Sequence, residues 1–147
     1  MAIDIRIMSI TDYDGVYNLW IKTPGMGLNS TDDSREGIKK YLKRNPTSSF
    51  VAECEGIIIG VIMAGHDGRR GYIHHTAVLP AYRNLGIAKR LVDCAMSALD
   101  DEDINKVALV AFKKNDIGNS FWEKIGFIDR EDLVYRNKNI HSLKRTK

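Results

Sequence analysis

Three apolar runs rich in β-branched residues follow one another in the middle of the chain, separated only by short turns. Residues 49–54 and 57–64 flank the pair Glu55-Gly56, and this arrangement predicts a β-hairpin. Residues 72–79 predict a further strand, which Pro80 ends. Strands in succession indicate a sheet, around which the helical segments on either side have to pack.

Helical periodicity appears on both sides of these strands. An apolar face over residues 16–20 predicts a first helix, and a second helix is expected between residues 32 and 45. From residue 84 onward, apolar residues again recur at helical spacing until the acidic residues 100–103 end the pattern.

The remaining segments complete a mixed order of strands and helices. Residues 3–7 alternate apolar and polar side chains, as a half-buried first strand does. Residues 106–112 predict a strand, residues 117–124 a short helix, and residues 127–136 one or two more strands. No linker or repeat divides the sequence, so residues 1–147 are expected to form a single domain.

The composition is that of a globular protein and argues against several functional classes. Hydrophobic residues make up 44% and charged residues 28% of the chain, and the net charge is +3 with no long block of either sign. Disorder and nucleic-acid binding are therefore not expected. The basic residues 138–147 are expected to be a solvated C-terminal tail. No apolar run is long enough to span a membrane, so no membrane association is expected.

The cysteines and histidines do not have the spacing of metal ligands. Cys54 and Cys94 lie in apolar stretches and are expected to be reduced thiols. The N-terminal residues carry Asp4 and Arg6 and lack the apolar run of a signal peptide. The sequence thus predicts a cytoplasmic protein without a metal site.

A strand, a short loop and a helix follow one another between Ala77 and Ala88. The start of a helix presents unpaired N–H groups and the positive end of the helix dipole, which together bind anions such as a pyrophosphate. Gly86 allows a phosphate to approach the backbone, and Arg83 can add a charge-assisted contact. An ordinary strand-to-helix turn has the same local sequence, so the loop alone does not decide its role.

A second motif downstream supports the cofactor interpretation. The pattern Val78-x-Pro80-x-Tyr82-Arg83-x-x-Gly86-x-Ala88, followed by Asn115, Asn119 and the aromatic run at residues 121–127, resembles the GCN5-related N-acetyltransferase (GNAT) superfamily. The resemblance covers nearly the whole chain and is strongest over residues 72–135. Two motifs in the correct order and separation are much more specific than either alone.

The resemblance implies an α+β (mixed α/β) fold. In this family a mostly antiparallel, twisted sheet of six to seven strands has helices on both faces, and its fourth and fifth strands splay apart to admit acetyl-CoA as co-substrate. It also implies that two copies can pair through their fifth and sixth strands as a homodimer. Carried over by position, the expected cofactor-binding residues are Thr76, Ala77, Val78, Arg83, Asn84, Leu85, Gly86, Ile87, Ala88, Asn115, Asn119, Phe121 and Trp122.

The family's reaction is attack of an amine on the thioester, which requires a base because amines are largely protonated at neutral pH. His74 and His75 are the candidate bases, since imidazole titrates near neutrality. Strand alternation predicts that they face opposite sides of the sheet, so that only one reaches the thioester. A structural role for either histidine is the competing interpretation.

Trp122 stands where the family commonly has a tyrosine that protonates the departing thiolate. An indole N–H can orient or hydrogen-bond the sulfur but cannot replace a tyrosine acid. The thiolate then leaves unprotonated or through water, or a tyrosine from another element substitutes: Tyr72, Tyr82 or Tyr135. Packing of Trp122 in the core is the alternative role.

Acceptor specificity is expected from the first two helices, the loop between them at residues 23–33 and the C-terminal strands. The glycine-rich part of this loop, residues 24–28, could act as a lid or be a plain connection. The leading interpretation is an N-acetyltransferase that acts on a primary amine of a small molecule, peptide or protein. The alternatives are a catalytically weak or inactive CoA-binding regulatory domain and a small interaction module without nucleotide binding.

Overall fold

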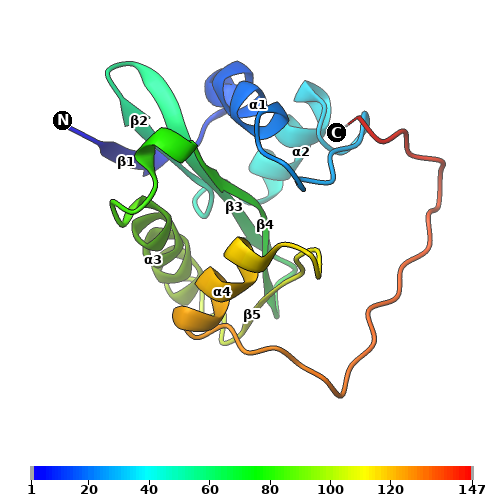
Figure 1. Ribbon diagram of the computed structural model, residues 1–147. Helices are drawn as coiled ribbons and strands as arrows, with labels where there is room; N and C mark the ends of the chain where they lie inside the picture. Colours follow the sequence, from blue (N-terminus) through cyan, green and yellow to red (C-terminus); the bar gives the residue numbers. More distant parts are fainter. Residues whose placement is uncertain (1, 147) are drawn as a thin grey trace.

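Five strands form one sheet in the computed structural model, which describes residues 2–146 (Figure 1). Along the sheet the strands keep their sequence order, with antiparallel pairing from β1 to β4 and parallel pairing of β4 with β5. The strands are β1 (Asp4–Ile7), β2 (Phe50–Cys54), β3 (Ile57–His66), β4 (Gly71–Val78) and β5 (Val107–Leu109). The predicted mostly antiparallel sheet is therefore confirmed.

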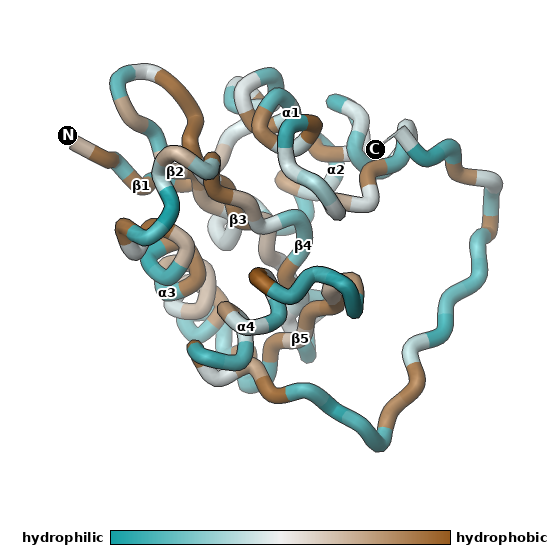
Figure 2. The backbone as a smooth tube through the Cα atoms, viewed as in Figure 1, coloured by the Kyte–Doolittle hydropathy of each residue, from teal (hydrophilic) through white to brown (hydrophobic). Residues whose placement is uncertain are grey.

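Helices cover both faces of the sheet, as expected (Figure 1). Helices α1 (Tyr13–Ile21) and α2 (Arg35–Arg44) pack on one face, and α3 (Ile87–Asp100) and α4 (Asp116–Lys124) on the other. Short 3₁₀ turns at Ile10–Asp12 and Pro80–Tyr82 precede α1 and α3. The apolar β3 separates the two cores (Figure 2). Among residues 2–146, no helix has both the length and the apolar character needed to cross a bilayer.

Helix α3 packs closely on β3 and thereby fixes the position of its own N-terminus. Its inward face consists of Ile87, Leu91, Ala95 and Leu99, which recur every fourth residue and are buried. A Cβ atom at Gly60 of β3 would lie only 3.1 Å from the Leu91 side chain, so the glycine permits this approach. The first turn of α3 is consequently held beside the end of β4.

The fourth and fifth strands separate after three residue pairs. Gly71, Tyr72 and Ile73 pair with β5, and the parallel ladder ends there. Beyond Ile73, β4 continues to Val78 along β3 alone. The backbone groups of this half of β4 that point away from β3 therefore line an open fork between β4 and β5, as the resemblance implies.

No strand forms within residues 127–136, so the prediction of one or two strands there is wrong. The expected total of six to seven strands becomes five within residues 2–146. Residues 129–132 are all charged, and Arg130 pairs with Asp132 across a local turn at 2.8 Å. This charged turn interrupts the apolar pattern, and the flanking Ile128, Leu133 and Val134 are exposed rather than paired with β5.

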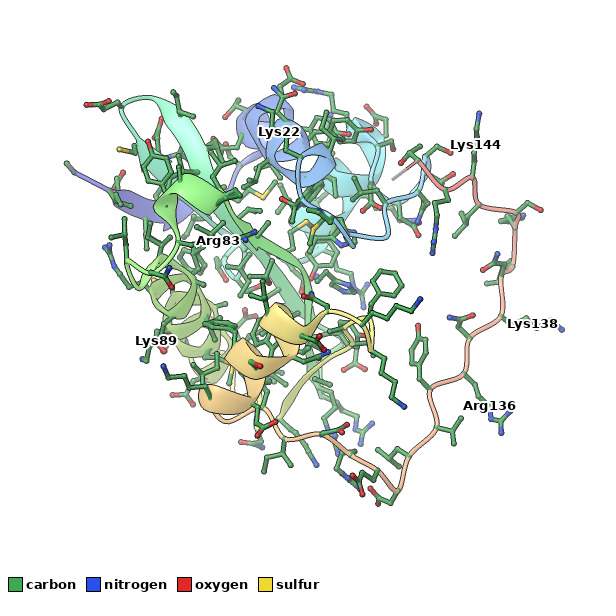
Figure 3. All side chains as sticks on the ribbon, viewed as in Figure 1. Lys22, Arg83, Lys89, Arg136, Lys138 and Lys144 are labelled. Carbon is green, nitrogen blue, oxygen red and sulfur yellow. The ribbon has the colours of Figure 1, made fainter. Side chains whose placement is uncertain are left out.

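The C-terminal segment leaves α4, passes around the molecule and returns to the loop between α1 and α2 (Figure 1). The Ser30 N–H donates to the Lys144 carbonyl at 2.8 Å, and the Thr146 N–H donates to the Leu28 carbonyl at 3.0 Å. The side chains of Arg136, Lys138 and Lys144 on this segment are exposed and point into solvent (Figure 3). Its end, however, is tied to residues 28–30 by backbone hydrogen bonds.

One ion pair fastens β1 to the turn before α1. Both terminal guanidinium nitrogens of Arg6, Nη1 and Nη2, donate to the Asp12 carboxylate, at 2.9 and 2.8 Å, and the Ser9 N–H donates to it as well. Burial works against the ionised form of Asp12, but Arg6 and Ser9 outweigh it and lower the pKa of this carboxyl below 3.8.

We expect Asp12→Asn to reduce the free energy of unfolding by about 1–3 kcal/mol near neutral pH, because Arg6 loses a charged acceptor. A depressed pKa stabilises the fold above the unfolded-state value and ceases to do so as pH falls through the folded-state value. The difference between wild type and variant should therefore shrink below pH 3.8. Urea unfolding over this pH range measures the difference. The control is Glu53→Gln, because Glu53 also pairs with Arg6, at 3.2 Å, but is more exposed than Asp12. A stability difference between wild type and Asp12→Asn that persists in acid would contradict the assignment.

Candidate active site

A β-bulge interrupts β4 at His75. Val61 of β3 pairs with Ala77 and Met63 with His74, so β4 has one residue more than β3 between these pairs. His75 has a φ of +33°, in the left-handed region that a residue with a side chain seldom adopts. Such local strain persists where surrounding contacts enforce it, and it is common at functional sites.

Both histidines of β4 face the α1/α2 layer. The ring of His74 lies against Tyr41 of α2 at 5.6 Å, and the ring of His75 lies against Trp20 of α1 at 5.2 Å. The two imidazole centroids are 6.4 Å apart. The prediction that they face opposite sides is wrong, because the extra residue of the bulge breaks the alternation of the strand.

His75 is held by two further contacts. Its carbonyl accepts a 3.1 Å hydrogen bond from the indole N–H of Trp20, which is fully buried. Its Nε2 lies 2.8 Å from Oδ1 of Asp33, which belongs to the loop before α2 and is 4% exposed. The sequence analysis did not identify Asp33 or Trp20 as site residues. Asp33 differs from its neighbour Asp32 in being buried, and burial cannot be read from two adjacent aspartates in the sequence.

His74 is exposed, and its ring lies 4.5 Å from the ring of Tyr72. The surrounding protein and, secondarily, the nearby His75 lower the pKa of His74. Its imidazole is therefore biased toward the neutral form. Burial also raises the pKa of Tyr72, which keeps its hydroxyl protonated.

The loop before α3 has the backbone geometry of an anion site. Gly86 is the N-cap of α3 in the left-handed conformation, with φ +78°, and Asn84 also has a positive φ of 64°. The space where a Cβ of Gly86 would stand is open, with no atom within 4 Å. The N–H groups of the first turn, at Ile87 and Ala88, have no acceptor within a helix that begins there.

Arg83 joins this loop to the fork. Its Nε donates to the carbonyl of Val78 at 3.3 Å, and Figure 3 shows the side chain lying at the end of β4. The Leu79 N–H pairs with the Ile59 carbonyl of β3, so the Val78 carbonyl points the other way, into the fork. Thr76 and Ala77, the other residues expected on this strand edge, lie in the same stretch of β4.

Helix α4 places four further predicted residues beside the fork. Asn115 caps the helix by accepting from the Gly118 N–H at 3.0 Å, and the Asn119 amide donates to the Phe112 carbonyl at 3.1 Å. Trp122 packs edge-on between Phe121 and Phe127, with centroid distances of 5.0 and 5.2 Å. These contacts connect α4 to the α3 core, and within residues 2–146 the indole N–H of Trp122 forms no hydrogen bond.

The three tyrosines considered as substitutes for an acid lie in different places. Tyr72 is beside His74, whereas Tyr82 approaches Cys54 on β2, and Tyr135 is exposed on the C-terminal segment. Of the three, Tyr72 is the one in contact with the histidine pair.

The loop between α1 and α2 lies across the mouth of the fork. A Cβ on Gly27 would lie 3.5 Å from the ring of Phe112, which follows β5, and Gly25 is in similar contact. The same loop supplies Asp33 to His75. The loop expected to recognise the acceptor is thus adjacent to the histidines.

Comparison with known proteins agrees with this geometry. An acetyltransferase of Photorhabdus laumondii is 30% identical over 93% of this chain and 96% of its own length. The solved structure of Ard1 from Thermoplasma volcanium superposes with a TM-score of 0.77 at 23% identity, over 87% of this chain and 84% of that one. The aminoglycoside N-acetyltransferase AAC(6′)-Iy in complex with CoA gives a TM-score of 0.73 at 22% identity, over 93% and 95% of the two chains.

The model of the acetyltransferase (GNAT) family matches residues 13–127, which include α1, α2, the fork and α4. This match extends over most of the chain, and the curated relative agrees with it across nearly its full length. The chain therefore belongs to the acetyltransferase (GNAT) family.

Proposed function

We propose that this acetyltransferase transfers the acetyl group of acetyl-CoA to a primary amine of a small molecule, peptide or protein. The observation that carries the proposal is that three features follow one another along β4 and the turn after it. They are an open strand edge beyond Ile73, the histidine pair, and the N-terminus of α3 preceded by left-handed Gly86. The structural neighbour that holds CoA and acts on aminoglycosides, which carry amines, supports the same reaction class.

The residues of the fork fit an acyl-CoA. The first-turn amides of α3 and the open space at Gly86 suit a pyrophosphate, and Arg83 adds a positive charge beside them. The unpaired edge of β4 at Thr76 and Val78 suits the amide groups of a pantetheine arm, which would continue the strand pairing that β5 leaves off. Asn119, Phe121 and Trp122 on α4 form the opposite wall of the proposed channel.

Acetyl-CoA supplies the activated acetyl thioester. The chain's own task is to deprotonate the acceptor ammonium, and we assign it to the histidine pair, with His75 favoured because its ring is fixed by Asp33 and Trp20. An N–H of β4 in the fork can donate to the carbonyl oxygen of the thioester, where negative charge develops as the amine attacks. We assign no acid role to Trp122 and propose instead that Tyr72, whose ring lies next to that of His74, returns a proton to the thiolate.

A titration with acetyl-CoA followed by a thiol-release screen tests this function. Saturating acetyl-CoA at a hundredfold excess over Kd should stabilise the fold by about 2.7 kcal/mol, because it binds the folded state alone. Release of free CoA with an aminoglycoside, a diamine or a peptide with a free N-terminus identifies the acceptor class. Stabilisation without release from any amine would favour a CoA-binding regulatory domain, and no stabilisation would refute the proposal.

The cofactor loop is tested by Gly86→Leu. The side chain would occupy the space assigned to the pyrophosphate, so we expect the Kd for acetyl-CoA to rise by about tenfold or more, which is roughly 1.4 kcal/mol. The backbone strain of a non-glycine residue at positive φ costs about 1–2 kcal/mol by itself. Gly68→Leu is the matched control, since Gly68 also has a positive φ and open space but lies in the β3–β4 turn. Equal Kd values for the two variants would refute the assignment.

A further inference from the structure

Asp33 is a buried carboxylate with no lysine or arginine partner within residues 2–146. Burial of a charged group is unfavourable unless its oxygens are hydrogen-bonded, and both oxygens of Asp33 are engaged. Oδ2 accepts from the Asn29 N–H at 2.8 Å, and Oδ1 lies 2.8 Å from Nε2 of His75. The Asp33 carbonyl also accepts from the Tyr13 hydroxyl, which fixes the residue from the side of α1.

Asp33 does not have the ordinary role of an acidic residue before a helix. The N-cap of α2 is Ser34, whose hydroxyl accepts from the Gly37 N–H at 3.0 Å. The neighbouring Asp32 is exposed and accepts only from the Asn29 side chain. The Asp33 side chain is thus directed at the histidine rather than at its own helix.

This contact determines which nitrogen of His75 carries the proton. An ionised carboxylate can only accept, so Nε2 must be the N–H donor of the neutral ring and Nδ1 the nitrogen with the lone pair. Within residues 2–146, Nδ1 forms no hydrogen bond, whereas Nε2 and the carbonyl of His75 are both engaged. A ring with one nitrogen fixed and the other unengaged is the arrangement that proton abstraction needs.

We propose that Asp33 is a positioning residue of the acetyl transfer, which holds His75 in the Nε2–H tautomer so that Nδ1 accepts the proton of the acceptor amine. The inference rests on the proposed function. One proton moves from the acceptor nitrogen to Nδ1, and the resulting imidazolium keeps its Nε2–H bonded to Asp33, which stays ionised. Through Asp33 alone, the loop between α1 and α2 takes part in the transfer.

The tautomer can be measured without any acceptor. Nitrogen NMR of the ¹⁵N-histidine-labelled full chain, with His75→Gln to assign the resonance, should show Nε2 protonated and Nδ1 unprotonated when the ring is neutral. In Asp33→Asn, the amide can donate to Nε2 and reverse the tautomer. Wild-type protein with the proton on Nδ1 would overturn the proposal, whatever the state of the variant.

Activity provides the second readout. With acetyl-CoA and the best amine of the screen, Asp33→Asn should lower kcat by about a hundredfold or more while the KM for acetyl-CoA stays within about threefold. The control is Asp32→Asn, which should retain both the tautomer and kcat. An unchanged kcat in Asp33→Asn overturns the positioning role and leaves the transferase intact. Absence of turnover in wild type overturns the proposed function, and with it any catalytic role of Asp33, although the tautomer would still be as described.

Discussion

Replacing His75 by glutamine is expected to lower kcat by about 10²–10⁴, the range that general-base catalysis contributes in enzymes. Glutamine is similar in size and can still hydrogen-bond to Asp33, but it cannot take up a proton at neutral pH. The Kd for acetyl-CoA should remain nearly unchanged, because the His75 ring lies against Trp20 and Asp33 on the α1/α2 side. The proposed cofactor contacts are instead the backbone edge of β4, the first turn of α3 and side chains of α4. Steady-state kinetics with separate binding measurements distinguish the two effects.

The matched control for this variant is His66→Gln. His66 also pairs with a carboxylate, with Nε2 at 3.0 Å from Glu102, but it stands at the opposite end of the β3–β4 ladder from the fork. Its replacement should leave kcat unchanged. If His75→Gln retains full kcat and His74→Gln loses it, the base would be His74, and the assignment of His75 would be wrong.

Trp20→Ala is expected to have the largest effect on stability, with a loss of about 3–5 kcal/mol in the free energy of unfolding. Trp20 is fully buried in the α1/α2 core, and its N–H satisfies the carbonyl of His75. Its removal leaves a cavity and an unpaired carbonyl at the strained residue of the bulge. Urea unfolding measures the loss, and kcat should fall by about tenfold as well because His75 is no longer fixed.

Two further variants separate the hydrogen bond from the packing. Trp20→Phe retains most of the ring but lacks the N–H, and should cost about 1–3 kcal/mol for the unsatisfied carbonyl. Leu91→Ala creates a cavity in the opposite core, where Leu91 is fully buried. It should reduce stability by about 2–5 kcal/mol without lowering kcat, provided that activity is measured well below its Tm. A similar loss of kcat in Leu91→Ala would show that destabilisation alone explains the Trp20 result.

Sequence patterns correctly predicted the helices and turns that are specified by residues close together in the chain. The period of Ile87, Leu91, Ala95 and Leu99 is sufficient to specify an amphipathic helix, and Glu55-Gly56 form the turn of the predicted hairpin with both residues at positive φ. The strand expected within residues 127–136, in contrast, could form only by pairing with the free edge of another strand, β5. The apolar character of Leu133 and Val134 carries no information about whether β5 offers that edge.

The site was predicted in part for a similar reason. The motif around Gly86 is contiguous, so the turn into α3 could be expected from the sequence, and the family resemblance implied the open fork. The partnership of His75 with Asp33 joins a strand to a loop 42 positions earlier, and nothing in the run Thr31-Asp32-Asp33-Ser34 distinguishes one aspartate from the other. The orientation of His75 required knowledge of the β3–β4 register, which sequence alternation alone does not contain.

The bulge makes this site sensitive to chain length as well as to side-chain identity. If Thr76 were deleted, β4 and β3 would have equal numbers of residues between the paired positions, and the ladder could become regular. Ile73 and Val78 would still face α3, and Ala77 would still face α1, so both cores would keep their residues. His75 alone would turn to the α3 side, away from Asp33. A single-residue deletion would therefore separate the proposed base from Asp33 without replacing any core residue, so the length of β4 as well as its side chains sets the geometry of the proposed site.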